Sequence, residues 1–206
     1  ESGVADAAPA WSPDGQWIAF IRAPRTNLYS RVPRLSIVGA EGGKVVELST
    51  EFDRSPMDFN WSADSRSLVV IFGDHGDGEI YRVTLKGEIE KTIAGRMQAE
   101  YVSVSADGGV AFVASTPLNP SELFWQPAGA DEPIQLTDAN TEFLDGVIVQ
   151  QTRELRFASH DGLEIQGWYM LPVGYEKGEK YPMILNIHGG PHVMWGPSAR
   201  TMWHEW

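Results

Sequence analysis

Trp11-Ser12-Pro13-Asp14-Gly15 is a turn-forming segment that leads at once into a short apolar run, and the chain repeats this pattern twice. The second copy, Trp61-Ser-Ala-Asp-Ser65, precedes an apolar run over 68–72, and the third, Val104-Ser-Ala-Asp-Gly108, precedes one over 110–113. Ser and Asp bond their own backbone in tight turns, and Gly accepts positive φ. A period of roughly 40–50 residues with several short strands per unit predicts the blades of a β-propeller.

Each unit also contains a second pair of predicted strands, separated by turn residues. These pairs are 34–38 with 44–48, 79–85 with 88–93, and 122–126 with 133–136. The sequence therefore predicts three blades, the C-terminal blades of a propeller, over 1–151. Propellers typically have about four to eight blades, so we expect the others to lie before Glu1. The repeated aspartates Asp14, Asp64 and Asp107 are interpreted as turn formers rather than acid–base residues.

The pattern changes near position 152. Residues 154–159 and 164–171 flank His160-Asp161-Gly162, which predicts a hairpin with an Asp-Gly turn. A polar loop over 172–180 follows, and the apolar run Met183–Ile187 is interpreted as a buried strand. Buried strands that alternate with helices are typical of an α/β domain. The fold class is thus mainly β: a partial propeller, then over 152–206 the opening of an α/β domain, truncated at Trp206.

The predicted buried strand runs into the loop His188-Gly189-Gly190-Pro191-His192. Two glycines and a proline allow backbone N–H groups to turn toward a ligand. A His-Gly-Gly loop after a strand is how α/β-hydrolases supply one N–H of an oxyanion hole. We interpret the His188 ring as structural, and His192 and Trp195 as weaker candidates for lining a substrate cleft. Residues 198–206 suggest one or two helical turns.

Composition narrows the classes of partner. The net charge is −12, which argues against nucleic acid or an anionic membrane as the main partner. The absence of cysteine excludes disulfides, thiolate nucleophiles and cysteine-based zinc sites. We expect no cofactor and no metal. The first residues lack the basic and apolar regions of a signal peptide, and a soluble protein of either cytoplasm or periplasm fits the sequence.

With the repeats, the His188–His192 loop and Met194-Trp-Gly-Pro197 in this order, the chain resembles the prolyl oligopeptidase family of serine peptidases, in its acylaminoacyl-peptidase branch. The resemblance covers nearly the whole chain. It implies a Ser-His-Asp peptidase for short, sometimes N-acylated peptides, whose propeller caps the active site. It also implies that the Gly190 N–H, with the Gly189 N–H as runner-up, donates to the oxyanion. The remainder of the hydrolase domain would be a partner, and a homo-oligomer fits.

The nucleophile is absent from these residues. No Gly-x-Ser-x-Gly occurs, and Gly196-Pro-Ser198-Ala-Arg200 lacks the final glycine and the preceding strand of a nucleophile elbow. We therefore expect the catalytic Ser, Asp and His downstream of Trp206, and the 206 residues alone to be inactive. Two other functions stay open: a non-catalytic propeller that binds peptides or proteins, and an esterase on the same scaffold.

Three further features have two interpretations each. The segment 74–79 (Asp-His-Gly-Asp-Gly-Glu) is read as a hairpin turn rather than a metal loop, because its spacing does not fit a calcium site. Four arginines near the long loop of the first unit would serve as surface charge or reach a peptide carboxylate: Arg22, Arg25, Arg31 and Arg34. Trp195, Trp203 and Trp206 would pack in a core or form part of a substrate wall.

Overall fold

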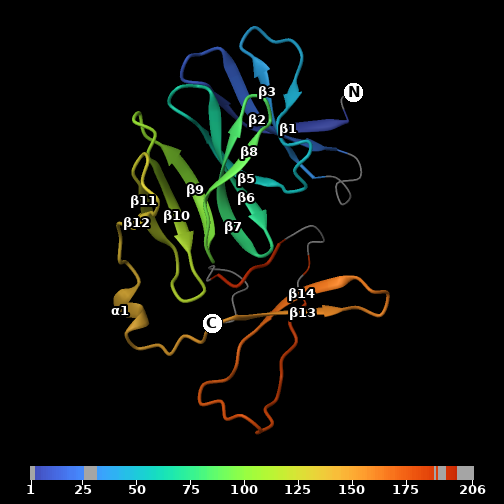
Figure 1. The fold of residues 1–206 in the computed structure, drawn as a ribbon, viewed down its shortest axis with the longest axis vertical. Helices are drawn as coiled ribbons and strands as arrows, with labels where there is room; N and C mark the ends of the chain where they lie inside the picture. The colour runs from blue at the N-terminus through green and yellow to red at the C-terminus, as the bar shows by residue number, and fades with distance from the viewer. Residues whose placement is uncertain (1–2, 26–31, 188, 190–193, 199–206) are drawn as a thin grey trace.

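The computed structural model describes residues 3–25, 32–187, 189 and 194–198, and in these ranges the chain is almost entirely β (Figure 1). Three four-stranded antiparallel units follow one another along the chain. The first has β1 (Val4–Trp11), β2 (Trp17–Pro24), β3 (Arg34–Gly39) and β4 (Val46–Glu47). The second has β5 (Pro56–Trp61), β6 (Ser67–Asp74), β7 (Asp77–Thr84) and β8 (Ile89–Ile93). The third has β9 (Gln98–Val104), β10 (Val110–Ser115), β11 (Glu122–Gln126) and β12 (Ile134–Gln135).

The three predicted strand pairs are confirmed as β3–β4, β7–β8 and β11–β12. Each unit also has a first strand, β1, β5 or β9, that the sequence analysis does not predict. These strands lie at the inner edges of the units, and the Val102 N–H of β9 donates to Asp58 Oδ2 of β5 at 2.8 Å. A single parallel bridge, Gly78 with Gln98, joins the second and third units. Three four-stranded units that adjoin at their first strands have the arrangement of propeller blades.

The repeated Ser-x-Asp segments form the same turn in each blade. The Ser12 hydroxyl donates to Asp14 Oδ1 at 2.6 Å, and the Ser62 hydroxyl donates to Asp64 Oδ1 at 2.7 Å. Ser105 makes the same bond to Asp107. In all three carboxyls, this hydroxyl bond is the main reason why the pKa is lowered from its ordinary value. The interpretation of these aspartates as turn formers is confirmed.

The core lies between the blades, and β6 supplies both of its halves. Val70 and Phe72 face the first blade, whereas Ile71 between them faces the third blade. All three side chains are fully buried. Because β6 is covered on both faces, its apolar run is continuous rather than alternating. Trp61 is also buried here, with its indole N–H donating to the Ala10 carbonyl across the blade boundary at 3.0 Å. The corresponding Trp11 is instead exposed.

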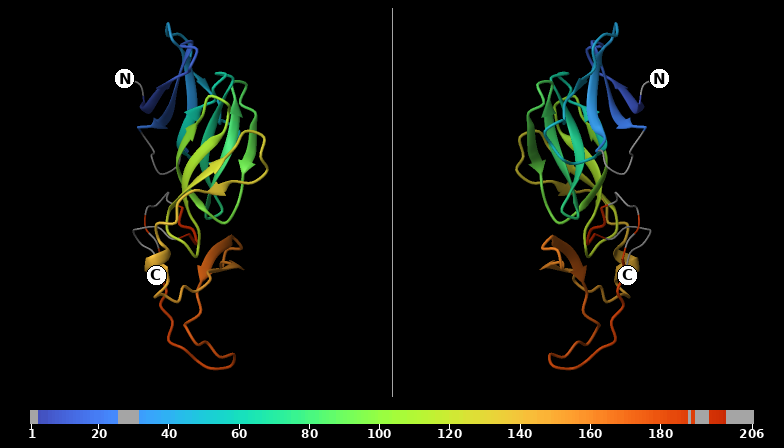
Figure 2. Two further views of the ribbon diagram at one scale, coloured as in Figure 1. Left: turned by 90° about the vertical axis from the view of Figure 1, so that its left-hand side faces the viewer. Right: turned by 90° about the vertical axis from the view of Figure 1, so that its right-hand side faces the viewer.

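Beyond the blades, a one-turn helix, α1 (Thr141–Leu144), precedes the predicted hairpin, which forms as β13 (Arg153–Ala158) and β14 (Glu164–Tyr169). Its turn repeats the blade chemistry, because the Ser159 hydroxyl donates to Asp161. Figure 2 shows the hairpin and the long loop after it at one end of the three blades. No helix among the described residues is long and apolar enough to cross a membrane.

The prediction of a buried strand over Met183–Ile187 is wrong for this structure. The segment has no strand, and Met183, Ile184, Leu185 and Ile187 are 72–94% exposed. A parallel strand is stable only when neighbouring strands bond its edges and cover its faces. No strand of the described ranges pairs with this segment. The helical turns expected over 198–206 fall almost wholly outside the described residues.

Candidate functional site

The predicted oxyanion loop is described only at Gly189, which is exposed and at which an added Cβ would meet no atom within 4 Å. His188, Gly190, Pro191 and His192 lie outside the described residues, so their assigned roles stay predictions. Description resumes at Met194–Ser198. Trp195, the other predicted cleft residue, is half-buried there.

The segment Met194–Ser198 contacts the tip of the second blade, between the ends of β6 and β7 (Figure 1). That tip is a two-residue turn, because Asp74 pairs with Asp77 and only His75 and Gly76 lie between them. Their φ values are 49° and 94°. Positive φ at both central positions is typical of a type I′ hairpin turn, which favours Gly. The hairpin interpretation of 74–79 is thereby confirmed.

Two contacts join the tip to the segment. The Gly76 N–H donates to Met194 Sδ at 3.2 Å. Gly196 lies so close that an added Cβ would be 1.6 Å from the Gly76 carbonyl oxygen. On the neighbouring face of β6, a Cβ at Gly73 would lie 3.0 Å from Met194 Cε. Only glycine at 196 therefore permits this backbone approach.

The same tip also contacts the β13–β14 hairpin. Gln166 Nε2 of β14 donates to the His75 carbonyl at 2.9 Å. The Trp168 ring occupies the space that a Cβ at Gly76 would need, at 2.3 Å. Two polar atoms nearby, Trp168 Nε1 and Ser198 Oγ, are buried with no hydrogen-bond partner among the described residues. The tip of the second blade therefore contacts both the β13–β14 hairpin and the segment Met194–Ser198.

Charged side chains of the blades and of the β13–β14 hairpin lie close to this tip. Arg96 is 3.9 Å from Asp77 Oδ2 and 3.8 Å from Glu154 Oε2 of β13. Asp77 Oδ1 is buried without a partner among the described residues. Burial raises the pKa of Asp77 to about 6, with Glu79 and Glu154 adding to the rise and with Arg96 and Lys91 opposing it. At neutral pH, where the second blade meets the β13–β14 hairpin, the Asp77 carboxylate is therefore poorly compensated.

We expect Asp77→Asn to stabilise the protein in a pH-dependent way. An aspartate in an unfolded chain titrates near 3.9. Between about pH 4 and 6 the folded protein keeps a proton that the unfolded chain has lost, so stability falls as pH rises through this window and is constant above it. The variant should gain about 1–3 kcal/mol in the free energy of unfolding at about pH 8, and nothing below about pH 4.

Urea unfolding at both pH values checks this prediction. Asp53→Asn is the matched control, because the Asp53 side chain is 84% exposed. That control should change the free energy of unfolding by less than about 0.5 kcal/mol at either pH. A loss of stability in Asp77→Asn at about pH 8 would mean that the Arg96 attraction outweighs burial.

Two of the four arginines considered as ligands for a peptide carboxylate have structural partners. Arg22 forms a two-bond pair with Asp6, with both N–O distances at 2.8 Å. Arg34 Nη1 donates to the carbonyls of Ser49 and Phe52 at 2.9 and 2.8 Å. These bonds fix strands and loops of the first blade. Arg31 lies outside the described residues.

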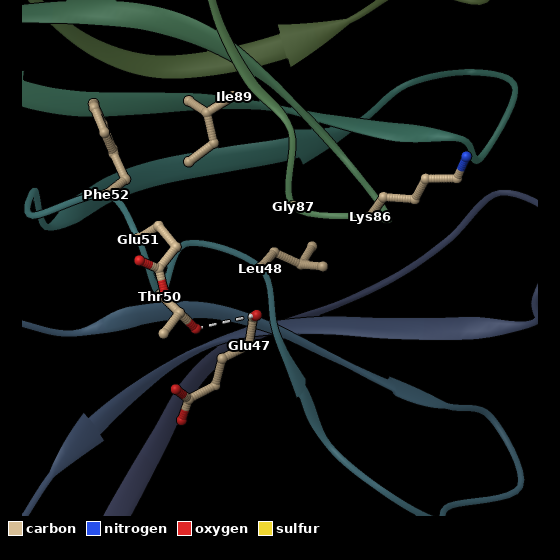
Figure 3. A pocket seen from close by; sticks show the side chains of 8 residues that line it. All are labelled: Glu47, Leu48, Thr50, Glu51, Phe52, Lys86, Gly87 and Ile89. Carbon is tan, nitrogen blue, oxygen red and sulfur yellow. Dashed lines mark hydrogen bonds between the residues drawn. The ribbon is translucent and has the colours of Figure 1, made fainter.

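A groove of about 280 Å³ opens between the first and second blades (Figure 3). Its walls come from β4, from the segment that follows β4, from the turn between β7 and β8 and from the start of β8. The lining residues are Glu47, Leu48, Thr50, Glu51, Phe52, Lys86, Gly87 and Ile89. None of them belongs to the β13–β14 hairpin or to the segments around the predicted oxyanion loop. The groove is therefore separate from the candidate site.

Comparison with known proteins gives the context for this junction. No family model matches the chain. Over 150 residues, or 70% of the chain, it is 39% identical to a Bacillus subtilis protein described as an uncharacterized peptidase, YuxL. It is 28% identical to a probable dipeptidyl-peptidase 5 of Trichophyton verrucosum over 97% of its length. A solved acylaminoacyl peptidase in complex with Z-Gly-Gly-Phe-chloromethyl ketone matches 89% of the chain with a TM-score of 0.74 and 26% identity.

These relatives are peptidases, and the resemblance to the prolyl oligopeptidase family is confirmed. It spans only 22% of the Bacillus relative, 28% of the Trichophyton relative and 28% of the acylaminoacyl peptidase structure. The three blades agree with the predicted partial propeller. The assignment of residues 152–206 to the opening of an α/β-hydrolase domain stays a prediction.

The contacts at the blade tip are not predictable from the sequence. Sequence patterns indicate the turn at 74–79 and the loop at 188–192, but they give no reason to place Gly76 against Gly196. The one sequence signal is the pair of glycines, at 76 in the turn and at 196 after the loop. A glycine that leaves room for close backbone approach is a known pattern, but its partner cannot be read from the sequence.

Proposed function

We propose that this chain is the propeller-to-hydrolase junction of a serine peptidase that removes N-acylated residues from short peptides. In this proposal, residues 1–151 are propeller blades that restrict access to the active site, and residues 152–206 begin the hydrolase domain. The short peptide and the remainder of the hydrolase domain are the partners. The catalytic Ser, His and Asp would lie outside these residues.

One observation carries the proposal: the similarity to the acylaminoacyl peptidase covers 89% of the chain, a share too large for residues 1–151 alone. That structure holds an N-blocked peptidyl chloromethyl ketone. The His-Gly-Gly-Pro sequence at 188–191 supports the same reading, since a purely binding propeller has no use for an oxyanion donor.

The residues of this chain would act on the carbonyl oxygen of the substrate. When the serine oxygen attacks the scissile carbonyl carbon, its proton passes to the histidine, and the C=O electron pair moves onto oxygen. The Gly190 N–H, or the Gly189 N–H as runner-up, would donate to that oxyanion. One such donor lowers the barrier by about 3–4 kcal/mol in serine peptidases.

A second candidate is dipeptide release from free N-termini. The similarity to the dipeptidyl-peptidase 5 relatives favours it, because it covers 97% of the chain. The two activities differ in whether the site accepts a blocked or a charged N-terminus. That difference depends on groups that contact the substrate N-terminus rather than on the oxyanion loop.

A panel of chromogenic substrates tests the proposal on the full-length protein that carries this sequence. We would compare N-acetyl-alanyl, alanyl-alanyl and N-blocked tripeptidyl p-nitroanilides, with p-nitrophenyl butyrate as the ester. The proposal expects kcat/KM to be at least about tenfold higher for N-acetyl-alanyl p-nitroanilide than for either other peptide, equivalent to about 1.4 kcal/mol of discrimination.

Three other outcomes would each assign a different function. Preference for alanyl-alanyl p-nitroanilide would favour the dipeptidyl-peptidase reading, and preference for the ester alone would favour an esterase. No turnover of any of them would favour the non-catalytic, peptide-binding propeller.

A further inference from the structure

The tip of the second blade is the described part of the propeller that contacts the backbone just after the predicted oxyanion loop. Met194 follows Gly190 by four positions and Gly196 follows it by six. Both residues contact the β6–β7 turn. The exit of the loop is therefore held by a different domain from the one expected to bear the nucleophile.

We propose that the His75-Gly76 turn is a positioning element for the oxyanion loop, and that it acts through Met194 and Gly196. This inference rests on the proposed function. The turn itself touches neither substrate nor reacting atoms; it sets where the following backbone lies. The propeller would then contribute to the chemical step, besides restricting access.

The contact leaves little freedom for the loop exit. At Gly196 the approach is backbone to backbone, because an added Cβ would also lie 2.7 Å from the Gly76 carbonyl carbon. Such a contact cannot be relieved by a side-chain rotation. At Met194 the sulfur accepts the Gly76 N–H, while the methyl group lies close to Gly73. The contacts at Met194 and Gly196 hold the segment at two points, so they fix its direction as well as its position.

The turn is a rigid support. β6 and β7 pair without interruption from Ser67–Thr84 to Asp74–Asp77, and Phe72 and Ile80 are fully buried close to the tip. From the other side, Gln166 and Trp168 of β14 contact the turn. A turn at the end of a paired, buried hairpin keeps its position far better than a free loop.

Displacing Met194 and Gly196, the residues that follow the oxyanion loop, should affect kcat more than KM. An oxyanion donor must lie about 2.7–3.1 Å from the developing charge, so a shift of a few tenths of an ångström weakens the transition state and leaves ground-state binding nearly intact. Access through the propeller would instead alter KM or both constants. The split between kcat and KM thus separates positioning from gating.

The experiment uses the full-length peptidase with Gly196→Ala and Met194→Leu. The first variant puts a methyl group against the Gly76 carbonyl; the second keeps the volume and removes the sulfur acceptor. Gly146→Ala is the matched control, because a Cβ there would meet nothing within 4 Å. We would measure kcat and KM per active site, counted by the end-point stoichiometry of fluorophosphonate labelling.

We expect Gly196→Ala to lose about tenfold or more in kcat per labelled site with KM within about threefold, and Met194→Leu to lose about threefold. Fluorophosphonate labelling should slow in parallel but reach the same end point. A variant that is only destabilised would show fewer labelled sites at unchanged kcat per site.

Equal kcat for Gly196→Ala and Gly146→Ala would overturn the inference and leave the proposed function standing. If Gly196→Ala does not fold, Met194→Leu decides in the same assay, and an unchanged kcat there overturns the inference. A parent protein that the probe does not label would overturn the proposed function and the inference together.

Discussion

Phe72→Ala should lower the free energy of unfolding by about 3–5 kcal/mol, the usual cost of emptying a buried phenylalanine site. Phe72 is fully buried in β6. Its ring packs edge-on against Phe52 and Tyr81, with centroid distances of 4.9 and 5.4 Å. The residues around it are held by two paired strands, so the cavity cannot collapse easily.

Urea unfolding followed by tryptophan fluorescence measures this loss, with buried Trp61 as a reporter in the same cluster. Phe143→Ala is the matched control, because Phe143 on α1 is 61% exposed. It should change the free energy of unfolding by less than about 0.5 kcal/mol. Similar losses in both variants would contradict a core centred between the first and second blades.

Gly190→Pro in the full-length peptidase should lower kcat by about 100- to 1000-fold with little change in KM. Proline has no backbone N–H, so the variant deletes the proposed donor without touching a side chain. Removal of one oxyanion donor has this effect in serine peptidases, because the lost bond exists mainly in the transition state. Steady-state kinetics on the preferred p-nitroanilide measures it.

Gly189→Pro is the paired variant, and it separates the two candidate donors. If Gly190 donates, Gly190→Pro should be the more damaging of the two. The reverse order would assign the donor to Gly189. Losses below about tenfold in both variants would contradict the assignment of an oxyanion loop to 188–191.

The sequence predicts the turns of this fold better than its inner strands. Each Ser-x-Asp turn is encoded locally. The Ser12 hydroxyl and the Asp14 carboxyl bond each other, and they accept backbone N–H groups no more than five residues away. The inner strand β1 has no such signal: Val4–Trp11 contains four alanines and a proline, which disfavour strands. Its place follows from the neighbouring blade, through contacts such as Trp61 with Ala10.

The apolar run Met183–Ile187 shows the opposite failure. Its composition indicates a buried strand, but burial depends on partner strands that no residue of the described ranges provides. Local propensity therefore identifies the segment's preference, not its state in this structure.

The candidate site also has one feature that the sequence indicates and others that it does not. The His-Gly-Gly-Pro loop is recognisable because its residue types carry the chemistry within a few positions. The contact between the blade tip and the residues after that loop is not recognisable, because Gly76 and Gly196 are 120 positions apart. Nor does the sequence indicate the raised pKa of Asp77, which comes mainly from burial at the junction.

Intact-mass and peptide-mapping analysis of the full-length protein after reaction with a fluorophosphonate tests directly whether this chain belongs to a serine peptidase. We predict one adduct, on a protein much larger than the 22.8 kDa of this chain and on a serine outside residues 1–206. No adduct, or an adduct on Ser198, would contradict the assignment of this chain to the junction of a serine peptidase.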